Sequence, residues 1–458
     1  MAGSKPASGN SAPARQPSLW VPLRYFMAAQ GAFIAALLWA PFQVSDLLDF
    51  YYQGHDLALT HLLTLGWITM TIMGASFQLV PVALETTLHS ERMARWQFWI
   101  MLIGVTAMVG HFWTGRHPGM AFGAAFVLIG VILFLINMGR TLWQLARWDI
   151  VARHVAAALA YLAATAILGN LMALDKIYDF LGGQVLRTIH AHAHLAGLGW
   201  VTMMIFGASY KLIPMFSLGD LQEGRLARWQ FWLLNLGLMG LFWALLLQSG
   251  WVLIFALLIA AGVGLFLWKM REVLRTRRRP RLDWGLRHAL SAMGYLAVVT
   301  LLGLWLATGW LPGEEFGARM AFGYGVLALL GWVSVMIVGM MYKILPFLIW
   351  HHRYSDLVGL RPVPPATQFL GELFPRMEFW LLHAGILTTV AGLILESRLL
   401  VQAGTIILAL AGLIFLLALT RIYRHLVPRL TPLPEVQTAK GQVRGAPSNR
   451  IPGLSPRI

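Results

Sequence analysis

Three histidines occupy alternate positions in the stretch RTIHAHAHLAGLGW, which runs from Arg187 to Trp200. On a helix, residues four apart lie about 40° apart in projection, and residues two apart lie about 200° apart. His190 and His194 are therefore predicted to share one face of a helix, while His192 points almost the opposite way. Neutral imidazole is a common ligand for iron, copper and zinc, and an ionisable side chain in a membrane span is a functional candidate. The stretch is a candidate cofactor site.

A fourth histidine, His61, lies in a second version of the same stretch. HLLTLGWITMTIMGASFQLVP (61–81) and HLAGLGWVTMMIFGASYKLIP (194–214) align without a gap, which places His61 at the position of His194. A third version, VLALLGWVSVMIVGMMYKILP (326–346), has a valine there. We therefore take four histidines as candidate cofactor-binding residues, namely His61, His190, His192 and His194.

Five other histidines fall in or near predicted loops, where a solvated or lipid-facing role is expected: His89, His117, His154, His288 and His425.

The composition predicts a polytopic membrane protein with an all-α fold. The chain has 458 residues, of which 58% are hydrophobic and only 12% are charged, and this balance is typical of membrane proteins. Apolar runs of about 20 residues, long enough to cross a bilayer, recur along the chain. Twelve transmembrane segments are predicted, beginning near Val21, Asp56, Arg95, Met120, Val155, Arg187, Arg228, Trp251, Ala289, Arg319, Arg376 and Leu399.

Self-similarity extends beyond the histidine stretch and defines a repeat of four helices. RMARWQFW at 92 recurs as RLARWQFW at 225, and RHVAAALAYLA at 153 recurs as RHALSAMGYLA at 287. Three such repeats predict a pseudo-threefold bundle. Shared glycines would permit close approach of helices, and the shared prolines Pro81, Pro214 and Pro346 are expected to end their helices. The predicted organisation is a disordered tail (1–20), repeats over 21–148, 149–282 and 283–426, and a second disordered tail (427–458).

Charge and missing residue types limit the possible functions. The net charge of +16 comes from Lys and Arg gathered on alternating loops, which predicts cytoplasmic termini and a bacterial-type inner (plasma) membrane location. Contact with anionic lipid headgroups explains these loops better than nucleic-acid binding does. The absence of cysteine excludes thiolate ligands, and the scarcity of Asp and Glu in the spans disfavours a carboxylate-based proton pump or ion-coupled transporter.

The segment HAHLAGLGWVTMMIFGASYKLIP resembles the tenth helix of the catalytic subunit of the haem-copper oxidase superfamily. The likeness is to the cbb-type oxidase and nitric-oxide reductase branches, through an H-x-H pair, an A-L-G-W-like segment and a Y-x-L-V-P-like turn. That family has twelve helices in three four-helix arcs with haems toward the outer side. In it, the first histidine of the pair, here His192, ligates a high-spin haem, and the second, here His194, ligates a low-spin haem. RTIH, with Arg187 and His190, resembles the R-x-x-H entry of the family's second helix.

Two features depart from the family pattern. The third repeat has Tyr324 and Val326 where the second has His192 and His194, and the segment after Arg228 contains no histidine for the family's copper ion. The resemblance therefore implies a haem b protein without the copper centre, with the haem between the segments that begin near Asp56 and Arg187. Its iron would be ligated by His61 from one side and by His194 or His190 from the other, and we take His61 and His194 as the predicted metal ligands.

Three functions are compatible with the sequence. The leading one is a haem-binding membrane protein in electron transfer or in nitric-oxide or oxygen metabolism, which as an oxidoreductase would meet a respiratory electron donor or partner subunit. The second is a copper or other metal site that uses the same four histidines without haem. The third is a non-catalytic relative that serves assembly, haem handling or transport.

Overall fold

The computed structural model describes residues 17–49, 51–221, 224–360 and 362–427, and these form helices with no strand among them. Twelve of the helices are long and apolar enough to cross a membrane, as the sequence predicts. The two predicted tails, apart from their edges, lie outside the described residues.

The first four spans comprise α1 (Trp20–Trp39) with η1 (Ala40–Phe42), a short α2 (Val44–Leu47), then α3 (Gly54–His61), η2 (Leu62–Thr69) and α4 (Met70–Ala83) as one continuous span, α5 (Glu91–Trp113) and α6 (His117–Trp143). The second four comprise α7 (Ile150–Tyr178), the continuous run of η3 (Gly182–Gln184), α8 (Val185–His194), η4 (Leu195–Thr202) and α9 (Met203–Ser217), then α10 (Arg225–Leu246) and α11 (Val252–Arg275).

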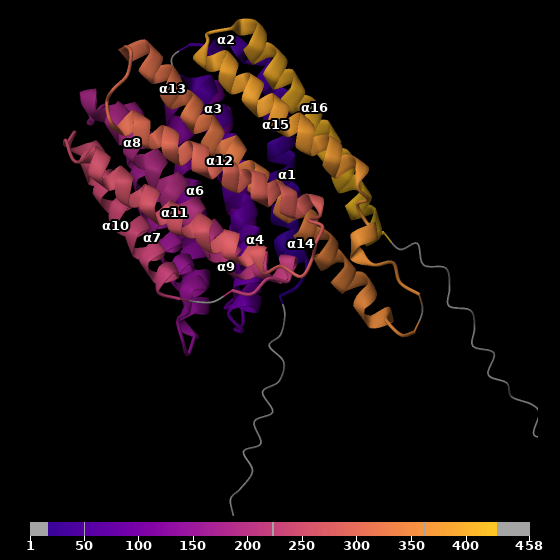
Figure 1. Cartoon of the computed structure of the whole chain (residues 1–458). Coiled ribbons are helices and arrows are strands. Elements are labelled where there is room, and N and C mark those ends of the chain that lie inside the picture. Colours follow the sequence, from indigo (N-terminus) through magenta and orange to yellow (C-terminus); the bar gives the residue numbers. More distant parts are fainter. Residues whose placement is uncertain (1–16, 50, 222–223, 361, 428–458) are drawn as a thin grey trace, which may run out of the picture.

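The last four spans comprise α12 (Trp284–Ala307), the run of α13 (Glu314–Val326), η5 (Leu327–Ser334), α14 (Val335–Tyr354) and η6 (Ser355–Leu357), then η7 (Ala366–Gln368) in a loop, α15 (Leu373–Ile394), and α16 (Arg398–Tyr423) with η8 (Arg424–Leu426). Figure 1 shows the three sets side by side as one bundle. Packing of α6 on α7, α11 on α12 and α16 on α1 closes the circle of three.

The second helix of each set changes from α to π geometry and back again. The three π-helical segments η2, η4 and η5 have eight residues each and lie at equivalent positions. Runs of π-helix are rare and often mark functional positions. In every copy the π segment contains a Gly-Trp pair and ends on Thr or Ser, so its geometry belongs to the repeated motif.

The three tryptophans of these motifs form a closed ring of hydrogen bonds at the centre of the bundle. Each indole N–H donates to the hydroxyl that ends the π segment of another copy: Trp67 to Ser334 over 3.1 Å, Trp200 to Thr69 over 3.2 Å, and Trp332 to Thr202 over 2.9 Å. All three indoles are at most 2% exposed. Because lipid offers no hydrogen-bond partner, each copy supplies the partner that another copy needs.

Glycines in α4, α9 and α14 allow each of these helices to touch the first helix of its own set. A Cβ atom added at Gly74 would lie 2.5 Å from a side-chain carbon of Tyr25. At Gly207 the same atom would meet His154 at 2.8 Å, and at Gly339 it would meet His288 at 2.6 Å. No larger residue fits without a shift of the helices. The predicted role of these glycines in close packing agrees with this geometry.

One expectation about helix ends is wrong. Pro81 and Pro214 lie within the last turn of their helices, but α14 continues past Pro346 to Tyr354. A proline lacks one backbone donor, so α14 loses one hydrogen bond there, but Leu348 and Ile349 beyond the proline are buried in the core, and this burial favours continuation of the helix.

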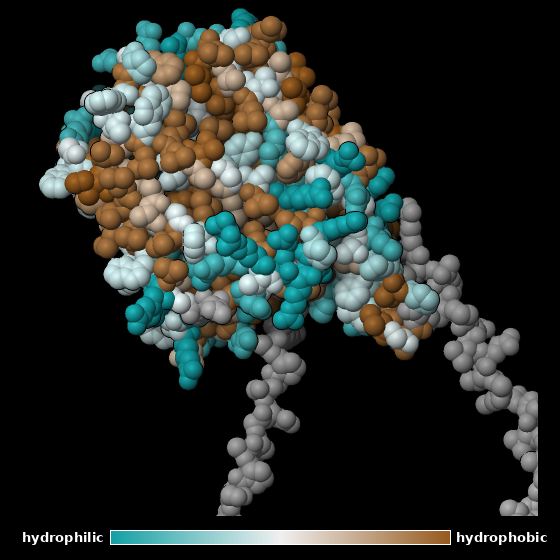
Figure 2. Space-filling model, viewed as in Figure 1, coloured by the Kyte–Doolittle hydropathy of each residue, from teal (hydrophilic) through white to brown (hydrophobic). Residues whose placement is uncertain are grey.

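The surface has the distribution expected of a membrane protein. Figure 2 shows a broad apolar zone, with hydrophilic residues concentrated at the end where the described chain begins and finishes. Large apolar side chains are exposed along the outer faces of the helices, including Trp96, Trp229 and Leu301. The protein therefore contacts a lipid bilayer through these faces.

We predict that Thr69→Val lowers the free energy of unfolding by about 1–3 kcal/mol, because it leaves the indole N–H of Trp200 buried without an acceptor. Valine keeps the shape of threonine, so packing changes little. Thermal unfolding in detergent micelles measures the effect, with the lipid-facing Trp96→Phe as a control of unchanged stability. In a double-mutant cycle with Trp200→Phe, the two losses should not add; additive losses would contradict the bond.

Candidate functional site

The two predicted metal ligands lie where α-helix changes to π-helix. His61 is the last residue of α3 and His194 is the last residue of α8, each followed at once by a π segment. The corresponding residue of α13 is Val326. The repeat thus holds equivalent backbone positions in all three copies, and two of them carry an imidazole.

Both of these imidazoles have a fixed tautomer. Nδ1 of His61 lies 2.7 Å from the carbonyl oxygen of Leu57, and Nδ1 of His194 lies 2.7 Å from that of His190. A carbonyl oxygen can only accept, so Nδ1 carries the proton and donates it, and the lone pair is on Nε2. Neither Nε2 atom bonds to any described residue. A metal-ligating histidine usually has its other ring nitrogen hydrogen-bonded in this way.

His192 lies on another face of α8, against α7. Its Cε1 would be 3.0 Å from a Cβ atom added to Gly169 of α7, and its Nδ1 is buried without a hydrogen-bond partner. This unpartnered nitrogen distinguishes His192 from His61 and His194, whose Nδ1 atoms both bond to backbone carbonyls.

His190 has a different environment from the other three. Its Nε2 is 3.3 Å from the hydroxyl of Tyr51, in the connection between α2 and α3, and its side chain is exposed. Burial raises the pKa of Tyr51, so the hydroxyl keeps its proton at neutral pH, and it donates to or accepts from the imidazole according to the tautomer of His190. This bond occupies the nitrogen that a ligand role would need.

The ring of His194 faces the third copy. It lies roughly parallel to the ring of Tyr324 in α13, with 6.2 Å between centroids, while the ring of His61 stacks on Phe112 of α5 at 4.9 Å. Within the described residues, no three His, Asp or Glu side chains are arranged to hold one metal ion together. Any metal at this end of the bundle would therefore take at most two protein ligands from these groups.

A second polar layer lies near the starts of α7 and α12 and involves two histidines that the sequence did not favour. His154 and His288 were expected in or near loops with a solvated or lipid-facing role, and this expectation is wrong. Both are 0% exposed and lie inside α7 and α12. They occupy equivalent positions beneath Gly207 and Gly339, and the glycines create the space that holds them.

The partners of these two histidines differ in charge. In the second copy, His154 bonds to the side-chain amide of Gln230 over 3.0 Å, and the hydroxyl of Tyr210 donates to the same amide. In the third copy, the acceptor is a carboxylate: Nε2 of His288 is 2.7 Å from Glu378 Oε2, and the Tyr342 hydroxyl donates to that oxygen over 3.3 Å. Glu378 is 1% exposed.

The His288–Glu378 pair shares one proton inside the bundle. Nδ1 of His288 lies 2.6 Å from the carbonyl oxygen of Trp284, which can only accept, so Nδ1 is protonated. A second proton must lie between Nε2 and the carboxylate for a contact of 2.7 Å to be favourable. Two signals in the sequence point to this cluster: the shared histidine of RHVAAALAYLA and RHALSAMGYLA, and the change from the glutamine of RWQFW to the glutamate of RMEFW.

The fold and the arrangement of histidine-bearing helices define a class of membrane protein, and comparison with known proteins agrees with it. No protein-family model matches the chain. The chain is 27% identical over 209 residues to a cbb3-type cytochrome c oxidase subunit CcoN1 from Stutzerimonas stutzeri, a match that covers 42% of this chain and 41% of that protein. It is 26% identical over 212 residues to cytochrome c oxidase subunit 1 from Rhodobacter capsulatus, covering 43% and 37%.

The likeness to a solved structure covers more of the chain. A heme-copper terminal oxidase dimer studied by cryo-electron microscopy contains a chain that superposes with a TM-score of 0.66 at 12% identity, covering 90% of this chain and 85% of that one. The curated sequence matches span less than half the length of those relatives. The chain is thus a divergent relative of haem-copper oxidase subunit I, which confirms the resemblance and the twelve-helix fold expected from the sequence.

We predict that Glu378→Gln changes the free energy of unfolding by less than about 1 kcal/mol, whereas Glu378→Leu lowers it by about 3–5 kcal/mol. Glutamine occupies this position in the other two copies and keeps an acceptor for Tyr342. Leucine would leave His288 and Tyr342 buried without their partner. Thermal unfolding in detergent measures both variants, and an equal loss for the two would show that the carboxylate itself is essential.

Proposed function

We propose that this protein binds a haem near the junctions of α3 with η2 and of α8 with η4, with His61 and His194 as the iron ligands. The observation that carries the proposal is the pair of anchored imidazoles, each with its Nδ1 proton held by a backbone carbonyl and its Nε2 lone pair free. A porphyrin fills four coordination positions of its iron, so it needs no more than two protein ligands. The donors present suit haem better than a bare metal ion, for which three described ligands are lacking.

Haem would supply a redox-active iron that exchanges electrons or binds a gas. The chain's own contribution is to fix the imidazoles, to exclude water with the partly buried apolar residues Leu59, Leu62 and Leu198 around them, and to hold the second helices in register. We propose haem b, and a role in electron transfer or in nitric-oxide or oxygen metabolism, with a respiratory electron donor or a partner subunit. The relatives named above are oxidase subunits, which supports this role.

The proposal does not include a haem-copper centre. The helix α10 contains no histidine over Arg225–Leu246, whereas the resemblance places the family's copper ligands in that segment. We also propose, from the distribution of Lys and Arg, that the protein lies in the inner (plasma) membrane with both termini in the cytoplasm. We propose in addition that the chain consists of three repeats, over residues 21–148, 149–282 and 283–426.

A copper or other metal site without haem is the second candidate. The observation that favours it is the Nδ1 of His192, which is buried without a hydrogen-bond partner and could serve as a metal ligand. A third candidate, a non-catalytic protein for assembly, haem handling or transport, would need none of these ligands.

We predict that purified protein shows a Soret band and a reduced-minus-oxidised haem b spectrum. His61→Ala or His194→Ala should remove or shift this spectrum by loss of an iron ligand, while His190→Ala should leave it unchanged because its Nε2 is already bonded. A spectrum that survives both ligand substitutions would refute the assignment. Loss in His192→Ala with bound copper and no haem would favour the second candidate, and protein free of both would favour the third.

A further inference from the structure

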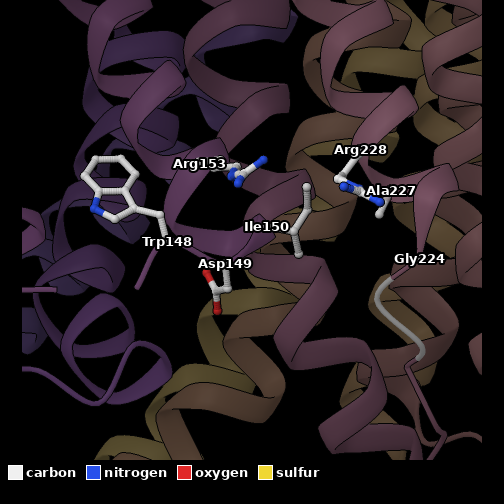
Figure 3. Close-up of a pocket in the computed structure, with 7 residues that line it drawn as sticks. All are labelled: Trp148, Asp149, Ile150, Arg153, Gly224, Ala227 and Arg228. Atoms are coloured by element: carbon white, nitrogen blue, oxygen red, sulfur yellow. The ribbon is translucent and has the colours of Figure 1, made fainter. Parts of the chain in front are cut away.

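The cytoplasmic end of the second copy, as the charge pattern orients it, contains a basic cavity that the proposed haem site does not use. The cavity has a volume of about 240 Å³ and lies where α7 and α10 begin. Figure 3 shows its lining side chains, with the guanidinium groups of Arg153 and Arg228 on the two helices. The lining residues are Trp148, Asp149, Ile150, Arg153, Gly224, Ala227 and Arg228.

The cavity exists where the second copy lacks a carboxylate that the other two copies carry. In the first copy, Glu91 stands four residues before Arg95 and pairs with it at 3.7 Å. Four residues before Arg376 stands Glu372, but four residues before Arg228 stands Gly224. Gly224 has an extended backbone (φ −129°, ψ −177°) that any residue adopts. Conformation therefore does not explain the glycine, and its consequence is a vacant position beside Arg228.

The guanidinium of Arg153 also has no partner within the described chain, unlike the guanidinium groups at the equivalent positions of the other two copies. In the first copy Arg24 donates to the carbonyl oxygen of Trp20 and lies over Phe98. In the third copy Arg287 donates to the carbonyl oxygen of Leu282 and lies over Trp284. Arg153 makes none of these bonds with a described residue. Two adjacent guanidinium groups without partners repel each other unless an anion lies between them.

The charge of the lining indicates the charge of that anion. Two arginines and one aspartate give the described lining a net charge of +1. Asp149 is also committed to the helix, since its carboxylate accepts from the backbone N–H of Ala152 over 2.8 Å. A phosphate diester carries a single negative charge, and guanidinium groups bind phosphate oxygens in a bidentate manner. The cavity therefore suits a monoanionic phosphate.

Its position at the membrane boundary indicates where that phosphate comes from. Trp148 is 46% exposed in the cavity wall, and Trp229, which follows Arg228, is 61% exposed. Tryptophan is enriched where the bilayer meets water, and basic pockets between spans on this side bind lipid headgroups. We infer that the cavity between α7 and α10 binds the phosphate of an anionic phospholipid, which takes the place of the carboxylate missing at Gly224.

Binding of phosphatidylglycerol to the full-length protein in detergent micelles, measured by native mass spectrometry, tests this inference. Arg153→Gln and Arg228→Gln should each weaken binding about tenfold. Gly224→Glu restores the residue of the other copies and should weaken binding at least as much, because the introduced carboxylate fills the cavity and pairs with Arg228. Arg95→Gln, in the first copy where the arginine already has a carboxylate partner, is the matched control and should have no effect.

Four results would overturn the inference. The first is unchanged binding in Gly224→Glu or in both arginine variants. The second is equal affinity for phosphatidylcholine, which has no net charge. The third is stabilisation by inorganic phosphate equal to that by the lipid, which would indicate a soluble anion. The fourth concerns Glu223, which lies outside the described residues: a tenfold gain in Glu223→Gln would show that Arg228 already has a protein partner.

Discussion

The ring of three tryptophan hydrogen bonds is the interaction on which the rest of the bundle depends. An indole N–H in the middle of a bilayer cannot bond to lipid, so it must find an acceptor inside the protein. Here every acceptor belongs to a different copy: Trp67 bonds to Ser334, Trp332 to Thr202, and Trp200 to Thr69. The ring closes only when all three second helices are present at the same depth. It therefore fixes the register of α4, α9 and α14 and, through the glycine contacts, of the helices that pack on them.

A fixed register lets equivalent positions carry different chemistry. At the α–π junctions the three residues are His61, His194 and Val326, so only the first two copies carry an imidazole there. In the second polar layer, around His154 and His288, the hydrogen-bond acceptor changes from the amide of Gln230 to the carboxylate of Glu378. The shared proton therefore belongs to the third copy. The same scaffold thus separates a neutral, ligand-ready end from an ionisable interior, without any change in how the helices pack.

The sequence predicted the spans and the repeat because both depend on patterns along the chain, namely apolar length and the recurrence of the Gly-Trp motif. It also placed His61 and His194 at equivalent positions, which the structure has at the ends of α3 and α8; their role as ligands stays a prediction. It did not predict the π segments or the tryptophan ring, since these depend on contacts between copies that spacing does not specify. The burial of His154 and His288 was missed for the same reason: their distance from the segment ends suggested loops, whereas α7 and α12 begin earlier and the glycines opposite them leave room for an imidazole.

Five histidines inside this bundle share one arrangement, whereas His192 does not, because its Nδ1 is buried without a hydrogen-bond partner. His61, His154, His194, His288 and His383 all direct Nδ1 to the carbonyl oxygen four residues earlier. Helix geometry therefore determines the hydrogen-bond partner of Nδ1 in each ring, and the surrounding side chains determine the partner of Nε2. For His154 and His288 the other nitrogen meets an amide or a carboxylate; for His383 it is enclosed beside the rings of Phe379 and Tyr295. For His61 and His194 it meets no described protein group, at half-buried positions beside a π segment. The two lone pairs of His61 and His194 support the proposal of a bound ligand, whereas Nε2 of His383, also without a partner, is buried inside the protein.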